Sequence, residues 1–180
     1  MLIGSRVRLR AIERSEIPLL TGWFNDPEIT QFIPLSWPMS IGDEERWFDQ
    51  MLQRPPELHP VMIDIHTNDG WLPIGDCGFN EVSWISRSAE LGIVIGEKRF
   101  WSQGYGGDAL RLLLRYGFNL LNLNRIFLEV YQNNLRAVRS YEKVGFVHEG
   151  RKREGIFKNG VYQDVLIMSV LRSEWQDTKV

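Results

Sequence analysis

Two segments of this chain carry residues whose types and spacing could do chemistry. In the first, Gly104, Gly106 and Gly107 directly precede a strongly amphipathic helical pattern. Glycine lets a backbone approach a ligand closely, and the free N–H groups of a helix's first turn attract an anion. In the second, Asn134 and Tyr141 lie seven residues apart, so they share one face of a helix. The two segments predict a phosphate-binding loop and a neighbouring helix that presents an amide and a phenol.

The elements that must position these residues follow from hydrophobic patterning. A strand is predicted over 89–95, a helix over 109–120 after the glycine loop, and a strand over 125–130. The next helix is capped by Asn134 and ends at Gly145. The remaining predictions are a strand over 6–12, a helix over 15–24, a helix capped by Ser40 and ended by Pro55 and Pro56, strands over 61–66 and 72–79 joined by a hairpin at 67–70, and a hairpin at Asn159-Gly160.

A dinucleotide-binding interpretation competes for the glycine loop. Gly104-x-Gly106-x-x-Ala109 fits the Rossmann fingerprint, and Glu129 follows at the distance expected of a ribose-binding acid. However, residues 96–103 separate the glycines from the preceding strand, whereas the fingerprint should open directly after it. Too little chain follows to complete a doubly wound sheet, so this interpretation stays a distant alternative.

Two sequence blocks and the C-terminal part of the chain resemble a known superfamily. The blocks are Gln103-Gly104-Tyr105-Gly106-Gly107 and Asn134-x-x-Ala137-x-x-x-Tyr141-Glu142-Lys143-x-Gly145-Phe146, and the later part contains Glu149-Gly150-Arg151 and Asn159-Gly160-x-Tyr162-x-Asp164. They resemble the GNAT superfamily of acyl-CoA-dependent N-acetyltransferases. The later part resembles the branch with ribosomal-protein N-terminal acetyltransferases of the RimJ/RimL type and bacterial spermidine acetyltransferases. The likeness covers roughly residues 4–175, and Trp101 departs from it, because many members have Gln or Arg there.

The resemblance implies a fold and a cofactor. The fold is α/β (α+β): a central mixed, mostly antiparallel sheet of about seven strands, with splayed middle strands and flanking helices, in one domain over residues 1–180. Acetyl-CoA is the implied co-substrate, lying between the strands at 90–95 and 126–131, and no metal is implied. The implied cofactor-binding residues are Ile93, Val94, Ile95, Gln103, Gly104, Tyr105, Gly106, Gly107 and Asn134.

The resemblance also implies direct transfer of the acetyl group to an amine. Tyr141 would protonate the leaving thiolate, since a phenol with a pKa of about 10 is protonated at pH 7. Glu90, at the start of the cofactor-binding strand, is the best candidate for the base, acting directly or through water. Glu129 is a weaker candidate, and His66 and His148 are weaker still. A non-catalytic CoA-binding module remains open, although the intact Asn134 and Tyr141 argue against it.

The acceptor is predicted less sharply than the reaction. An α-amine with a pKa of about 8 is neutral more often at pH 7 than a lysine-type amine at about 10.4. We therefore expect a protein N-terminus of the ribosomal-protein type, with a small amine such as a polyamine, amino acid or antibiotic as the alternative. Segments that line the acceptor pocket in proteins of this type contain Phe32, Trp37, Trp47 and Trp84.

Composition limits the partners and the compartment. A net charge of −2 over 180 residues argues against non-specific binding of nucleic acid. No apolar run reaches the roughly 20 residues that a membrane helix needs, and the N-terminus does not resemble a signal peptide. Cys77 is the only cysteine, so an intrachain disulfide is excluded. These features predict a cytoplasmic protein without nucleic-acid or membrane partners. A homodimer stays open, because dimers are common among similar proteins.

Overall fold

The structure, a computed structural model, describes residues 1–35 and 37–177. The strands are β1 (Leu2–Ile3), β2 (Val7–Ala11), β3 (Val61–Thr67), β4 (Gly70–Ser83), β5 (Ser88–Ile95), β6 (Arg125–Tyr131), β7 (Val147–Lys158) and β8 (Val161–Leu171). The helices are α1 (Ile17–Phe24), α2 (Pro27–Thr30), α3 (Ile41–Leu52), α4 (Tyr105–Arg115) and α5 (Leu135–Val144). Short 3-10 turns lie at Arg14–Glu16, Pro56–Leu58 and Lys98–Phe100, and a π turn at Tyr116–Leu120 extends α4.

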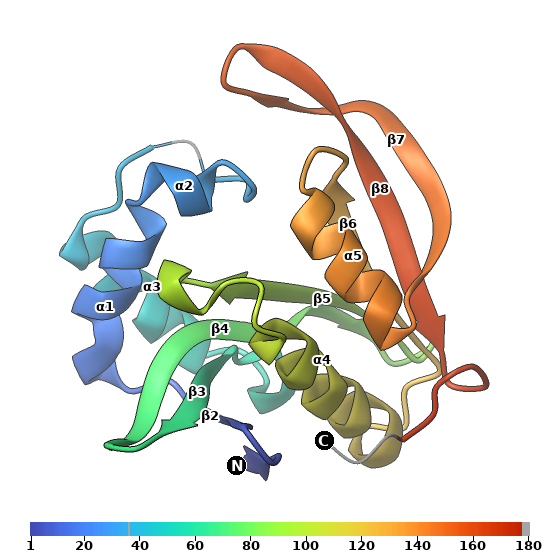
Figure 1. Ribbon diagram of the computed structural model, residues 1–180, viewed down its shortest axis with the longest axis horizontal. Helices are drawn as coiled ribbons and strands as arrows, with labels where there is room; N and C mark the ends of the chain where they lie inside the picture. Colours follow the sequence, from blue (N-terminus) through green and yellow to red (C-terminus); the bar gives the residue numbers. More distant parts are fainter. Residues whose placement is uncertain (36, 178–180) are drawn as a thin grey trace.

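The strands form one mixed sheet in the order β1-β2-β3-β4-β5-β6-β8-β7 (Figure 1). Among the described residues, every neighbouring pair is antiparallel except β5 and β6. These two central strands are parallel and pair only over Ser88–Glu90 and Arg125–Phe127, after which they diverge. The mostly antiparallel sheet with splayed middle strands is thereby confirmed. The count is eight because Leu2–Ile3 adds a short edge strand, and this sheet does not have the parallel order of a dinucleotide-binding fold.

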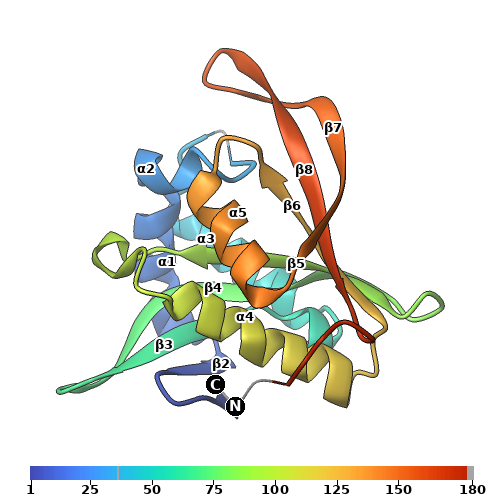
Figure 2. The same ribbon diagram turned by 45° about the vertical axis from the view of Figure 1, so that its right-hand side comes forward.

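The two faces of the sheet carry separate apolar cores. On one face α4 buries Leu110, Leu113 and Leu114 against the strands, and on the other α1 and α3 bury Leu20 and Phe48. Figure 2 shows α4 and α5 in front of the sheet and α1 and α3 behind it. Alternation along each strand therefore decides which side chains reach the face covered by α1 and α3. We call this second face the α1–α3 face.

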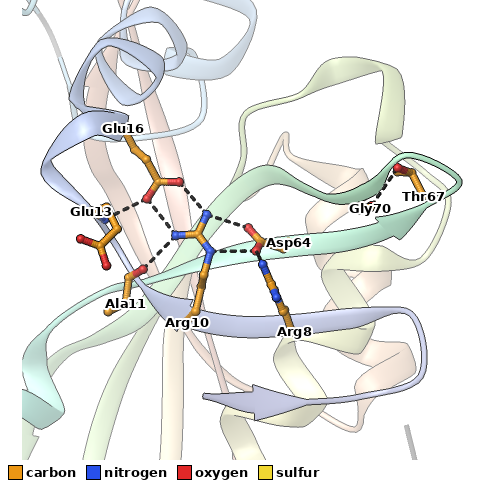
Figure 3. Close-up of polar contacts among 8 residues, drawn as sticks. All are labelled: Arg8, Arg10, Ala11, Glu13, Glu16, Asp64, Thr67 and Gly70. Carbon is orange, nitrogen blue, oxygen red and sulfur yellow. Dashed lines mark hydrogen bonds and ion pairs between the residues drawn. The ribbon is translucent and has the colours of Figure 1, made fainter.

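A buried carboxylate holds the N-terminal strand and α1 together on the α1–α3 face (Figure 3). Asp64 of β3 is 1% exposed and accepts hydrogen bonds from the Nε atoms of Arg8 and Arg10, both at 2.8 Å. Arg10 also donates to Glu16, just before α1, at 2.9 Å. A buried carboxylate is tolerated only when it is paired and hydrogen-bonded, so this arrangement fixes how α1 approaches the sheet.

The helix ends follow the sequence predictions closely. Ser40 caps α3 in a capping box with Asp43, Asn134 caps α5, and Gly145 ends α5 at φ +107°. The predicted helix over 15–24 begins instead with the 3-10 turn at Arg14–Glu16. None of the helices in the described ranges combines the length and the apolar character required to span a bilayer.

Candidate active site

A cleft of about 940 Å³ follows the divergence of β5 and β6. Its walls come from α2 and α3, from β4 to β7, from the glycine loop and from α5. Figure 1 shows α1, α2 and α3 on one side of this region and α5 with the β7–β8 hairpin on the other. Twelve residues predicted from the sequence line it: Phe32, Trp47, Glu90, Ile93, Val94, Ile95, Gly104, Tyr105, Gly106, Gly107, Asn134 and Tyr141.

Three predicted residues lie elsewhere. Trp37 is 69% exposed and Trp84 is 52% exposed, and neither belongs to the cleft lining. Trp84 lies in the turn between β4 and β5, outside the cleft. The side chain of Gln103 turns back to donate to the Arg99 carbonyl at 2.7 Å. Of the four residues predicted for the acceptor pocket, Phe32 and Trp47 line this cleft, and they stay a prediction for the acceptor.

The glycine loop contains one glycine that its backbone conformation requires and two that it does not require. Gly104 adopts φ +89°, which only glycine reaches without strain. Gly106 and Gly107 have ordinary helical positions, and a Cβ at either would meet only ordinary contacts, at 3.7 Å to Ile95 and 3.5 Å to Arg111. Each glycine nonetheless costs a helix about 1 kcal/mol relative to alanine. The two glycines therefore leave space beside the backbone at a cost in helix stability, which indicates a ligand that comes close to this backbone.

Trp101 occupies the position at which the sequence departs from the family pattern. Its indole N–H donates to the Ile95 carbonyl at 2.7 Å, and the Arg136 guanidinium lies 3.6 Å from its ring centroid. The carbonyl of Ile95, predicted to bind the cofactor, is therefore already occupied by the protein. The side chain braces the loop against the end of β5 while its ring lines the cleft.

Asn134 and Tyr141 both face the cleft from α5, as their spacing predicts. The Oδ1 atom of Asn134 caps the helix by accepting from the Ala137 N–H at 3.2 Å, which leaves its amide N–H₂ group available. Tyr141 is 8% exposed, and its hydroxyl has no hydrogen-bond partner among the described residues. Burial raises the pKa of Tyr141 to about 12. The phenol therefore keeps its proton throughout the neutral range and can donate it.

The candidate bases occupy different environments. Glu90 lines the cleft and accepts from Asn80 at 3.4 Å. Glu129 also lines the cleft but forms an ion pair with Lys152. His66 packs edge-on against Trp71, and His148 contacts Glu142 at 3.0 Å, both away from the cleft lining. The geometry keeps Glu90 as a candidate and sets the two histidines aside.

Among the polar residues of the cleft that were missed from the sequence, two have buried polar atoms without a partner in the described structure. Asp76 of β4 and Tyr131 of β6 both line the cleft, and the Asp76 Oδ1 and the Tyr131 hydroxyl are buried without a hydrogen-bond partner in the described structure. Burial and the neighbouring Glu44 carboxylate raise the pKa of Asp76 to about 7. The sequence signal that could have identified Asp76 is its position as a single charged residue within the mostly apolar segment 71–79.

Three of the four cations in the described cleft lining lie on α5, and the fourth, Arg54, follows α3. Arg136, Arg139 and Lys143 line it on the same side as the glycine loop. Backbone N–H groups at a helix start and flexible cations nearby are the donor set that a pyrophosphate requires. Together with the open space at Gly106 and Gly107, these groups fit a phosphate-bearing cofactor such as acetyl-CoA.

Comparison with known proteins identifies the family. The model of the acetyltransferase (GNAT) domain matches residues 6–147. This chain belongs to the GNAT family. It is therefore an acyl-CoA-dependent N-acetyltransferase, and the resemblance first seen in two short blocks extends over most of the chain.

Relatives within the GNAT family include polyamine enzymes. The spermidine N(1)-acetyltransferase of Vibrio cholerae serotype O1 is 32% identical, over 96% of this chain and 97% of its own. The crystal structure of the Vibrio cholerae spermidine N-acetyltransferase in complex with CoA and spermine is 30% identical, with a TM-score of 0.82 over 93% of this chain and 96% of its own. YdaF of Bacillus subtilis, provisionally described as a ribosomal N-acetyltransferase, is 32% identical over 58% of this chain and 57% of its own.

Proposed function

We propose that this N-acetyltransferase acts on a primary amino group of a polyamine or a similar small polycation. The observation that carries the proposal is the separation of charge in the cleft. Asp76 and Glu90 line it from the α1–α3 face, together with Arg54 just after α3, whereas three cations, Arg136, Arg139 and Lys143, line it from α5. An anionic cofactor and a cationic acceptor would each meet the opposite charge, which favours their binding together.

The relatives support the same choice of acceptor. The spermidine acetyltransferase of Vibrio cholerae is matched over nearly its whole length, both in sequence and in structure. The protein N-terminus favoured by the sequence has support from a relative matched over little more than half of the chain. The small-amine alternative therefore replaces the protein N-terminus as our leading proposal.

A bridge across the acceptor side of the molecule also favours a slim substrate. Lys158 of β7 is 8% exposed, and its ammonium donates to the carbonyls of Ile33, at 3.1 Å, and Leu35. These hydrogen bonds tie the end of the β7–β8 hairpin to the segment that follows α2. An extended polyamine could thread beneath such a bridge more easily than the terminus of a folded protein.

The chain's own groups have defined tasks in this proposal. The first-turn N–H groups at Gly104–Gly107 would hold the pyrophosphate, and the backbone of Ile93 would hold the pantetheine arm and polarise the thioester carbonyl. The carbonyl of Val94, which the sequence also assigned to the cofactor, points towards Gly75 of β4 instead. The Asn134 amide would donate to the cofactor near the thioester. The amine nitrogen would then form the C–N bond as the C–S bond breaks, and Tyr141 would protonate the leaving sulfur.

Thiol release tests the proposed function. Purified protein with acetyl-CoA should release free CoA when spermidine is added, and mass spectrometry should find spermidine carrying one acetyl group. Protein that binds CoA but acetylates no polyamine would contradict the proposed acceptor, and activity restricted to N-terminal peptides would restore the earlier expectation.

A further inference from the structure

Two unpaired polar groups lie level with each other on the α1–α3 face. Asp76 of β4 is the register partner of Val94 in β5, and Glu90 in β5 is the partner of Phe127 in β6. Counting four residues onward along both parallel strands places Tyr131 at the level of Val94. Because the side-chain period of a strand is two, Asp76, Val94 and Tyr131 all project on one face. Asp76 and Tyr131 therefore flank the divergence of β5 and β6 from either side.

Neither group is satisfied by the protein itself. The Asp76 carboxylate has no hydrogen bond or ion pair with any described residue, and its Oδ1 is buried. Tyr131 is 7% exposed, and its buried hydroxyl also has no partner within the described part of the chain. An unpaired buried polar group costs about 1–3 kcal/mol, so two such groups beside one cleft indicate a polar ligand between them.

The charge around Asp76 specifies the kind of ligand. Glu44 of α3 is 3% exposed, and its carboxylate makes no ion pair with any described residue. Burial, and then the neighbouring Asp43, raise the pKa of Glu44, and Glu44 in turn acts on Asp76. Two neighbouring acidic groups that have no ion-pair partner among the described residues favour a ligand that brings a positive charge. An ammonium group has that charge and can donate to both Asp76 and Tyr131.

We propose that Asp76 and Tyr131 bind the reacting amino group of the acceptor, and that Asp76 takes the proton which this group must lose before it attacks the thioester. The inference rests on the proposed function and names its amine site. The ammonium transfers one proton to the Asp76 carboxylate, and the freed lone pair forms the C–N bond while the C–S pair stays on sulfur. Sulfur takes the Tyr141 proton, and the second proton of the nitrogen passes to solvent. Solvent then returns a proton to Tyr141 and removes the proton from Asp76.

The position of Asp76 distinguishes it from Glu90. Glu90 lies where β5 and β6 are still paired, four residues or about 13 Å along the strand from the level of Val94. Asp76 lies one strand spacing, about 4.8 Å, from Val94, and Val94 adjoins Ile93, whose backbone is proposed to hold the thioester. Its raised pKa, about 7, also suits a base that works at neutral pH.

The test compares Asp76→Asn, Tyr131→Phe and Glu90→Gln with the unaltered enzyme, using spermidine from pH 6 to 10. The other acids on this face include Glu44, Asp64, Glu90 and Glu129, and Arg54 also lines the cleft. Glu90→Gln therefore tests the rival base, and the exposed Glu45→Gln serves as the control. We expect Asp76→Asn to lower kcat/KM about 100-fold at pH 7. This deficit should shrink towards pH 10, because more of the spermidine amino groups are then already neutral in solution and do not need a base. Tyr131→Phe should mainly raise KM, and thermal unfolding should verify that each variant folds.

Binding of spermidine to the CoA-saturated proteins completes the test. Calorimetry should find weaker binding by Asp76→Asn and by Tyr131→Phe, with CoA affinity unchanged. An active enzyme whose Asp76→Asn variant keeps its rate and affinity, or loses rate equally at every pH, would overturn the assignment alone. CoA-saturated enzyme that neither binds nor acetylates spermidine would overturn the amine site together with the proposed function.

Discussion

The indole N–H of Trp101 donates to the backbone carbonyl of Ile95 at 2.7 Å and so joins the glycine loop to the last residue of β5. The loop and the strand hold the two ends of the proposed cofactor site, one for phosphate and one for pantetheine. Arg136 of α5 lies over the face of the same ring. One side chain thus positions three elements around the cleft.

Trp101→Phe should weaken CoA binding while leaving the fold intact. The phenyl ring can still lie beneath Arg136, but the hydrogen bond to Ile95 is lost, at a cost of about 1 kcal/mol. The expected result is a Kd for CoA about five-fold higher by calorimetry. Trp84→Phe, in the β4–β5 turn outside the cleft, is the control and should leave the Kd unchanged. Equal affinities for all three proteins would show that the brace is dispensable.

Gly106→Ala should separate ligand binding from stability. The protein offers room for the new Cβ, whose nearest neighbour would be Ile95 at 3.7 Å, so the free energy of unfolding should stay the same or rise by up to about 1 kcal/mol. CoA affinity should fall, because the methyl group enters the space proposed for phosphate. Gly22→Ala in α1, where a Cβ meets nothing within 4 Å, should change stability without changing CoA affinity. A Gly106→Ala protein that binds CoA normally would contradict the phosphate site.

Tyr141→Phe should reduce kcat by about 100-fold or more with little effect on CoA affinity. The pKa of Tyr141, raised by burial to about 12, keeps the phenol protonated in alkaline buffers. An acid acts in its protonated form, so this shift extends activity upward in pH. The unaltered enzyme should therefore keep its kcat between pH 8 and 10. A Tyr141→Phe variant with normal kcat would remove the residue from the mechanism.

The geometry around Glu16 predicts a loss of stability in acid. Burial acts to raise the pKa of Glu16, but hydrogen bonds from Arg10 and from the Glu13 backbone outweigh it, so the pKa lies below its ordinary value of 4.5. The stabilisation is complete above pH 4.5 and is lost as the pH falls through the folded-state pKa. Glu16→Gln should lower the free energy of unfolding at pH 7 by about 1–2 kcal/mol and flatten its decline in acid. Urea unfolding from pH 3 to 7 measures this, with the exposed Glu45→Gln as a control that should behave like the unaltered protein.

The sequence predicted the elements well because their signals are local. Ser40, Asn134 and Gly145 each mark a helix end through their own backbone chemistry, and Asn159-Gly160 marks a hairpin. The glycine loop and the pairing of Asn134 with Tyr141 depend on short spacings, so these residues could be placed beside the cleft in advance.

The rest of the site depends on contacts between distant residues. Asp76 reaches the cleft only because β4 aligns it with Val94 on one face, and Glu44 approaches it from another element. Trp84 is the opposite case. It is close to the site residues in sequence, but it lies in the β4–β5 turn and does not line the cleft. The unpaired Asp76 and Tyr131 atoms could be recognised only after the whole environment was known.

The most direct test of the central claim is the kcat/KM for thiol release from acetyl-CoA with three acceptors: spermidine, butylamine and a ribosomal N-terminal peptide. A cleft with acidic groups on its acceptor side should favour spermidine over butylamine by about ten-fold or more, and over the peptide by a larger factor. A peptide preferred to spermidine, or butylamine used equally well, would contradict the account of this enzyme as a polyamine acetyltransferase.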